Sequence, residues 1–104
     1  MRNKKLISKI KASINITAPN ASIILYGSQA RGNSTKHSDI DILILIDNEN
    51  LTFNDEQNIV NPIYDLEFES GKIISPLVLT KNDWELKHSI TPFYKNIQKE
   101  GIIL

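Results

Sequence analysis

The chain has 104 residues, and its 12 lysines and arginines balance its 12 aspartates and glutamates, so the formal net charge is zero. A neutral chain lacks the excess of positive charge that marks a general nucleic-acid binder, and a nucleic-acid partner is not expected. The absence of cysteine excludes disulfides, thiol catalysis and cysteine-based zinc sites. Any catalysis must therefore use oxygen, nitrogen or metal.

This length predicts a single domain over residues 1–104, too short to hold a catalytic domain and a separate substrate domain. We therefore expect the substrate to be bound mostly by another molecule. The longest apolar run, Ile42 to Ile46, is far shorter than a membrane span, and the N-terminus lacks the apolar core of a signal peptide. These features predict a cytoplasmic protein with no membrane association.

The first predicted element is an amphipathic helix over residues 3–16. Its apolar residues recur at helical spacing, opposite several lysines: Leu6, Ile7, Ile10 and Ile14. A basic segment can also be a targeting helix or bind an anionic surface, but this spacing favours a helix that packs on the core. Pro19 and Asn20 then end the helix.

Two predicted buried strands flank a polar loop. Residues 22–26 (SIILY) form a short apolar run that ends at Gly27, as expected for a strand that leads into a functional loop. Residues 39–47 (DIDILILID) are rich in isoleucine and leucine, which suits a strand covered on both faces. The loop between them, GSQARGNSTKHS, consists mainly of small and turn-forming residues.

Residues 50–71 fit both a helix and a strand. The helical spacing rests on Ile59, Ile63 and Leu66, and the strand alternation on Tyr64, Leu66 and Phe68. We favour the helix, because Asn54 or Asp55 can cap its start and Gly71 can end it. Pro62 would remove one hydrogen bond within such a helix and predicts a kink.

The last third of the chain predicts one strand and one helix. Residues 73–79 (IISPLVL) are apolar, and Pro76 among them indicates an edge strand or a bulge. Thr91 and Pro92 predict the start of a helix, FYKNIQKE, that ends at Gly101. The apolar residues after Gly101 are expected to pack on the core or on a partner.

Asp39 and Asp41 are the strongest candidates for catalysis. Two residues apart on a strand, they leave the same face about 7 Å apart along the backbone, so both carboxylates can approach one cation site. Magnesium prefers oxygen ligands and commonly shares them between carboxylates and substrate phosphates. A pair of such ions can clamp the attacking and leaving oxygens of a nucleotidyl transfer. Ile40 and Ile42 are expected to face the core and hold these ligands rigidly.

The polar loop supplies candidate phosphate contacts. Gly27 allows the backbone to approach a phosphate closely, and Ser28 offers a hydroxyl and an amide. A helical turn over residues 29–32 would add free amides, and Arg31 can bind phosphate through two hydrogen bonds. A Gly-Ser pair alone is usually a turn, and Asp-x-Asp alone is often a solvated strand end. Their order along the chain is what indicates a site.

The pattern Gly27-Ser28-x-Ala30-Arg31-Gly32, followed by Ser38-Asp39-Ile40-Asp41-Ile42, closely resembles the minimal nucleotidyltransferases of the DNA polymerase beta superfamily. The resemblance is clearest over residues 22–47. It implies an α/β (α+β) fold with a small mixed sheet flanked by helices, and a nucleoside triphosphate, ATP in the first instance, bound with two Mg²⁺ ions. The implied metal ligands are Asp39 and Asp41, and the implied nucleotide contacts are Gly27, Ser28, Arg31 and Ser38.

The resemblance also implies a partner. Members of this kind are often encoded beside a helical HEPN protein, and some transfer AMP to that protein and silence a toxin. The implied function is transfer of a nucleoside monophosphate to a hydroxyl of a partner protein, as the antitoxin of a HEPN toxin. A homo-oligomer is also compatible with the sequence.

One departure from the superfamily leaves a second function open. Active members usually carry a third carboxylate on a later strand, and the apolar residues 73–79 offer none. In the strand interpretation of residues 64–68, Asp65, Glu67 or Glu69 would supply it, whereas in the helical one they are surface charges. The alternative function is therefore a weakly active or inactive nucleotide-binding module that acts as an antitoxin or regulatory subunit by contact alone.

The remaining candidates have simpler explanations. His37 lies near the carboxylates but is expected to be solvated, and His88 has no visible partner. Trp84 and the Phe93-Tyr94 pair can stack on a base, although packing is the favoured interpretation. Lysines in the last helix are expected to form a solvated face.

Overall fold

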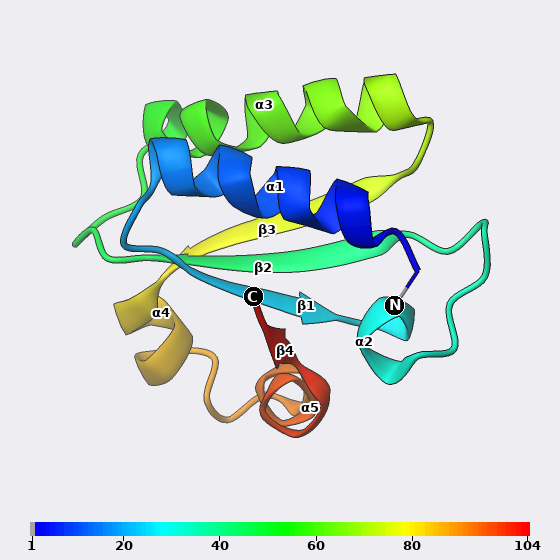
Figure 1. The fold of residues 1–104 in the computed structure, drawn as a ribbon. Helices are drawn as coiled ribbons and strands as arrows, with labels where there is room; N and C mark the ends of the chain where they lie inside the picture. Colours follow the sequence, from blue (N-terminus) through cyan, green and yellow to red (C-terminus); the bar gives the residue numbers. More distant parts are fainter. Residues whose placement is uncertain (1) are drawn as a thin grey trace.

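A mixed four-stranded sheet, in the order β3-β2-β1-β4, organises the chain. The computed structural model describes residues 2–104 (Figure 1). The strands are β1 (Ser22–Tyr26), β2 (Ile40–Ile46), β3 (Ile74–Thr80) and β4 (Ile102–Ile103). β1 pairs antiparallel with both β2 and β4, and β2 pairs parallel with β3.

Helices cover both faces of this sheet. They are α1 (Lys4–Thr17), α2 (Ser28–Arg31), α3 (Phe53–Ser70), α4 (Lys81–Leu86) and α5 (Pro92–Glu100). Figure 1 shows α1 and α3 side by side over one face, α4 and α5 on the other, and α2 beyond the end of β1. The small mixed sheet flanked by helices that the resemblance implied is confirmed. No helix within residues 2–104 combines the length and the hydropathy needed to cross a membrane.

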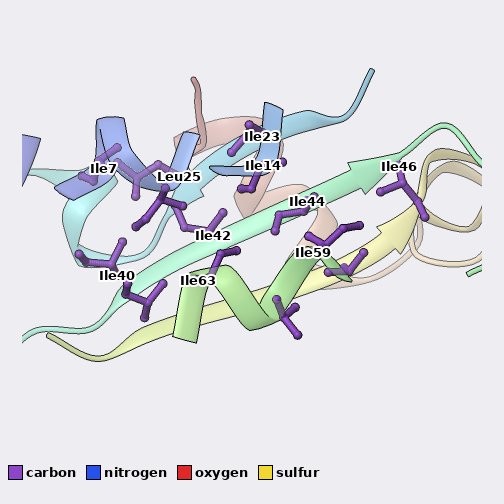
Figure 2. Close-up of a cluster of buried hydrophobic side chains, with 14 residues drawn as sticks. Ile7, Ile14, Ile23, Leu25, Ile40, Ile42, Ile44, Ile46, Ile59 and Ile63 are labelled. Atoms are coloured by element: carbon purple, nitrogen blue, oxygen red, sulfur yellow. The ribbon is translucent and has the colours of Figure 1, made fainter. Parts of the chain in front are cut away.

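Side chains alternate along β2 and enter two hydrophobic cores on opposite faces of the sheet. Its even-numbered isoleucines, Ile40, Ile42, Ile44 and Ile46, are buried in one core with side chains of α1 and α3 (Figure 2). Leu43 and Leu45 point to the other face and pack with Trp84 and Ile97 of α4 and α5. Both faces of β2 are thus covered, which explains its nearly continuous apolar run. The predicted burial of Ile40 and Ile42 is confirmed, because neither is exposed.

Residues 53–70 form a helix, so the strand interpretation of residues 64–68 is wrong. The expectation that Asn54 or Asp55 caps this helix is also wrong, because the cap is Thr52. Its hydroxyl accepts a hydrogen bond from the Asp55 amide (3.0 Å), and the Asp55 carboxylate accepts one from the Thr52 amide (3.3 Å). This reciprocal pair satisfies two amides that a helix start leaves free. Pro62 lies within the helix.

The other predicted elements appear close to their expected places. The first helix covers residues 4–17, one residue later than predicted, and the SIILY strand has the predicted bounds. β3 is an edge strand, as Pro76 indicated. Thr91 caps α5, which ends before Gly101. α4 was not predicted, because its six residues carry little periodic pattern; Thr80 caps it through a hydrogen bond from the Asp83 amide (3.0 Å).

The apolar residues after Gly101 pack on the core, which was one of their two predicted placements. Ile102 and Ile103 form β4 against β1, and the Leu104 amide donates a hydrogen bond to the Ile23 carbonyl (2.9 Å). Ile102 and Leu104 contact the core below α1, while Ile103 is exposed. The tail therefore completes the sheet beside β1.

Candidate functional site

The candidate residues gather at one end of the sheet, where β1 ends and both β2 and β3 begin. Tyr26, Asp41 and Ser75 occupy matching positions on these three neighbouring strands. Their side chains share the face covered farther along by α4 and α5, because Asp41 alternates with the buried Ile40 and Ile42. Adjacent strands lie about 4.8 Å apart, so the Asp41 carboxylate has a tyrosine on one side and a serine on the other.

Gly27 and Asp41 are in direct contact. A Cβ built on Gly27 would collide with Oδ2 of Asp41 and would lie 3.3 Å from its Cγ. The Gly27 backbone has φ 73° and ψ −153°, a conformation that is essentially restricted to glycine. The predicted phosphate loop therefore touches the predicted metal carboxylate, and the glycine is required both for backbone geometry and for space.

The loop continues as a short helix, close to the turn predicted over residues 29–32. α2 begins at Ser28 directly after Gly27, and the Arg31 amide donates to the Gly27 carbonyl (3.1 Å). The first amides of a helix have no partner within it, so the backbone after Gly27 presents free N–H donors. Gly32, with φ 78°, ends the helix and turns the chain toward β2.

Arg31 interacts with two carboxylates, those of Glu100 and Asp41. Its Nη1 atom is 3.5 Å from Oε2 of Glu100 on α5, and both side chains are partly exposed. Its positive charge also acts on Asp41, where it opposes a rise in the pKa of the carboxyl group. The structure thus brings Arg31 to the same site as Asp41, as the sequence predicted, and adds Glu100 as its present partner.

The environment of Asp41 disfavours its charged form. Burial raises the pKa of this carboxyl group first, the neighbouring Asp39 raises it further, and Arg31 opposes the change. The pKa of Tyr26 is also raised, first by burial and then by the charge of Asp41. Two close carboxylates that repel each other in a partly desolvated place are stabilised by a cation. The donor set therefore fits a divalent metal ion.

A hydrogen-bonded turn precedes the carboxylates. The Ser38 hydroxyl accepts a hydrogen bond from the Thr35 amide (2.9 Å), and the Ser38 amide donates to the Thr35 carbonyl (3.1 Å). Nζ of Lys72 donates to the Lys36 carbonyl (2.7 Å), which ties the loop to the start of β3. Ser38 thus holds the turn next to Asp39, and its contact with a nucleotide stays a prediction. His37 is exposed, as expected for a solvated residue.

Among residues 2–104, no third carboxylate is grouped with Asp39 and Asp41. In the part of the chain that the structure describes, no three histidine, cysteine, aspartate or glutamate side chains are grouped to hold a metal. Glu67 accepts a hydrogen bond from the Ile74 amide (2.8 Å) and belongs to α3, on the other face of the sheet. Asp65 and Glu69 are exposed on the same helix. The position beside Asp41 on β3 is Ser75.

A pocket of about 150 Å³ adjoins this site, and sequence reasoning missed it. It lies between the end of β1 and α5, and is lined by Tyr26, Gly27, Arg31, Phe93, Asn96, Ile97 and Glu100. Trp84 is 2% exposed and packs on Phe93 and Tyr94, which confirms packing as the main role of these aromatic residues. The sequence offered the Phe93-Tyr94 pair as able to stack on a base, but no local pattern joins Phe93 to Tyr26 and Arg31, so it did not place the pocket.

Known proteins resemble this chain in sequence and in fold. The sequence profile described as "Nucleotidyltransferase domain" matches residues 5–104. A protein of Methanocaldococcus jannaschii named "Putative protein adenylyltransferase" is 40% identical over 73 residues, which are 68% of this chain and 48% of that protein. The chain thus spans about half the length of this relative. A solved structure described as a "putative minimal nucleotidyltransferase" matches with a TM-score of 0.61 and 21% identity, covering 100% of this chain and 97% of the other.

Proposed function

This chain belongs to the nucleotidyltransferase domain family, and from that premise we propose that it transfers AMP from ATP to a hydroxyl group of a partner protein, with Mg²⁺ as cofactor. The observation that carries this proposal is the contact between Gly27 and the Asp41 carboxylate. It sets a candidate metal ligand against a candidate phosphate loop, as nucleotidyl transfer requires. ATP and the protein acceptor are proposed from the resemblance and from the name of the archaeal relative.

Each residue of the site has a proposed role. Asp39 and Asp41 hold the metal, and a second Mg²⁺ is proposed with it. Gly27 and Ser28 bind the triphosphate through backbone amides and the Ser28 hydroxyl, and Arg31 steadies it. Bound Mg²⁺ would neutralise phosphate charge and orient the reacting oxygens. Ser38 holds the turn beside Asp39 and offers its hydroxyl to the nucleotide.

The proposed transfer is a displacement at the α-phosphorus of ATP. The acceptor oxygen forms a bond to this phosphorus, the bond to the bridging oxygen breaks, and pyrophosphate leaves while the hydroxyl proton passes to solvent. The proposed acceptor is a HEPN-type protein that the transfer silences, which rests on the resemblance of Gly27-Ser28 and Asp39-x-Asp41 to minimal nucleotidyltransferases. Action in the cytoplasm, where ATP is available, belongs to the same proposal.

The test follows label from the α-phosphate of ATP. The purified chain is incubated with Mg²⁺ and labelled ATP, with and without its neighbouring gene product, and compared with an Asp39→Ala, Asp41→Ala double variant. We expect label on the partner protein with the wild type and none with the variant. The matched control is Asp47→Ala, Glu49→Ala, because these exposed carboxylates follow the other end of β2. Equal transfer by the wild type and the Asp39, Asp41 variant would refute the proposal.

A second candidate function has support from one observation. Ser75, and not a carboxylate, stands beside Asp41, and no third acidic ligand is grouped with the pair among residues 2–104. This arrangement supports a module that binds nucleotide and acts on its partner by contact alone. The same double variant separates the two functions: an enzyme loses its effect on the partner, whereas a contact-only module keeps a stable complex without label transfer.

A further inference from the structure

Two aromatic side chains, Tyr26 and Phe93, line the pocket beside Gly27. Tyr26 and Phe93 meet edge to face, with ring centroids 5.3 Å apart and an interplanar angle of 75°. Phe93 in turn packs edge to face on the buried Trp84, at 5.7 Å. This second contact holds the Phe93 ring in place, and Ile97 adds an apolar surface. Apolar walls with few polar groups are typical of small-molecule sites.

Two polar side chains border the same pocket. Asn96 and Glu100 are four residues apart on α5, so they lie one turn apart on the same side of the helix. The Asn96 amide group can both donate and accept hydrogen bonds, whereas the ionised Glu100 carboxylate only accepts. A ring that binds here must therefore present at least one donor toward Glu100.

The position of the pocket relates it to the nucleotide. Gly27 and Arg31 line the pocket and also belong to the proposed triphosphate site. With a volume of about 150 Å³, the pocket has room for one part of a nucleotide and not for all of it. A triphosphate bound at Gly27 and Ser28 leaves the nucleoside as the part that extends into the adjoining hollow.

We propose that this pocket holds the adenine ring of the donor nucleotide and that Asn96 and Glu100 select the base. This inference rests on the proposed function, which places the phosphates. The exocyclic amino group of adenine donates to the Glu100 carboxylate, and the Asn96 amide pairs with an amino group and a ring nitrogen, a pairing adenine offers. Hypoxanthine carries a carbonyl oxygen in place of that amino group and would face Glu100 with a second acceptor.

The ion pair between Arg31 and Glu100 does not prevent this role. Both side chains are more than a third exposed, so the pair contributes little to stability. A triphosphate offers Arg31 a stronger negative partner than one carboxylate. Glu100 is then free to accept a hydrogen bond from the base.

The test compares three ligands on four proteins by calorimetric titration with Mg²⁺ present. The ligands are α,β-methylene ATP, the corresponding inosine compound and inorganic tripolyphosphate, which has no base. The proteins are the wild type, Asn96→Ala, Glu100→Gln and the control Gln98→Ala. All three substituted side chains are exposed on α5, and Gln98 does not line the pocket, so each variant is expected to fold.

We expect Asn96→Ala to raise the Kd of the ATP analogue about 3- to 10-fold, the effect of one lost hydrogen bond, and to leave tripolyphosphate binding unchanged. Glu100→Gln should lower the preference for the adenine over the inosine compound by a similar factor, because the new amide can donate to the carbonyl oxygen. Gln98→Ala should match the wild type for every ligand.

The failures of the two proposals differ in this experiment. If the ATP analogue binds the wild type and all three variants equally, and the base preference is unchanged, the base lies elsewhere and the inference is wrong while the proposed function stands. If the analogue does not bind the wild type, the proposed function fails and the inference fails with it.

Discussion

Among single residues, Asp41 sits where its negative charge is least favourable. Burial and the nearby Asp39 raise the pKa of its carboxyl group, and Arg31 offsets only part of this effect. Carboxylates with shifted pKa values are common at functional sites. A cation bound beside such a group would stabilise its charged form. The charged form of Asp41 is thus unfavourable in the protein without metal, and under the proposed function a bound Mg²⁺ would stabilise it.

The first prediction concerns Asp41→Asn without metal. The folded pKa of Asp41 lies above its usual value of 3.8, so its favourable contribution is present below that value and is lost as pH rises through the folded pKa. At neutral pH the ionised carboxylate therefore destabilises the fold. With a chelator present, Asp41→Asn should raise the free energy of unfolding by up to about 1 kcal/mol after solvent screening, and this gain should shrink toward about pH 4. Thermal unfolding across this pH range measures it; a lower Tm of the variant at neutral pH would contradict the argument.

A second prediction uses the space at Gly27. Gly27→Ala forces a side chain into a glycine-only conformation, which costs about 1–3 kcal/mol, and pushes it against the Asp41 carboxylate. We expect a lower Tm and loss of binding of Mg²⁺ with α,β-methylene ATP. Gly32→Ala is the control, because its φ is also positive but its Cβ would meet nothing within 4 Å. If both variants bind the nucleotide alike, the Gly27 contact has no functional role.

Ser75 allows a gain-of-function prediction. Ser75→Asp places a third carboxylate next to Asp41 on the neighbouring strand. It should tighten Mg²⁺ binding about 10-fold in the presence of the ATP analogue, since carboxylates bind this ion directly, and should lower stability when metal is removed. Calorimetric titration of Mg²⁺ measures the effect, with Ser75→Asn as the uncharged control. Equal Mg²⁺ affinity in both variants would show that position 75 does not reach the metal site.

At the scale of elements, the stability of α3 depends on the hydrogen bonds at its first turn. This helix covers β2 and β3 and contains Pro62, which cannot donate a backbone hydrogen bond. The reciprocal hydrogen bonds of Thr52 and Asp55 compensate at the first turn by satisfying free amides. The cap thus stabilises the helix that packs on Ile40 and Ile42, which are the neighbours of the candidate metal ligands Asp39 and Asp41.

The cap leads to a prediction on stability alone. Thr52→Ala should lower the free energy of unfolding by about 1 kcal/mol, which corresponds to a fall in Tm of about 4–8 °C in a domain of this size. Asn54→Ala, in the same turn, should change the Tm little because its side chain makes no cap. Thermal unfolding of both variants decides the matter. A larger loss for Asn54→Ala would mean that the cap is misassigned.

At the scale of the whole molecule, the C-terminal segment connects α5 to the sheet. α5 carries Asn96 and Glu100, and β4 follows it directly to pair with β1, the strand that leads to Gly27. Gly101 connects α5 to β4. A Cβ added there would lie 2.6 Å from the Ile97 carbonyl oxygen and 2.7 Å from Cγ2 of Ile24. The position of the pocket wall therefore depends on close packing at Gly101.

Gly101→Ala tests this connection. The extra methyl group has no room without movement of α5 or β1, and overpacking of this kind costs about 1–3 kcal/mol. We expect a lower Tm together with weaker binding of the ATP analogue, because the pocket wall shifts. Ile103→Ala changes the same segment at an exposed side chain and should leave both unchanged. Normal stability and normal binding in Gly101→Ala would show that the pocket wall does not depend on the packing at Gly101.

Sequence patterns alone predicted most of the elements and supplied the candidate residues of the site, whose roles stay a prediction. The bounds of β1, the edge position signalled by Pro76 and the cap at Thr91 depend on residues close together in the chain. The candidates Asp39 and Asp41 also lie close together in the chain: Asp39 directly precedes β2, and Asp41 is its second residue. Such features are local, because dihedral preferences and side-chain periodicity act within one element.

Only the tertiary structure decided how these pieces meet. The register of three strands puts Asp41 between Tyr26 and Ser75, and the packing of α5 on the sheet makes the pocket with Asn96 and Glu100. It also decided between helix and strand for residues 64–68, where two periodicities overlapped. The reason is physical: contacts between distant segments arise from register and core packing, and no pattern of neighbouring residues encodes them separately.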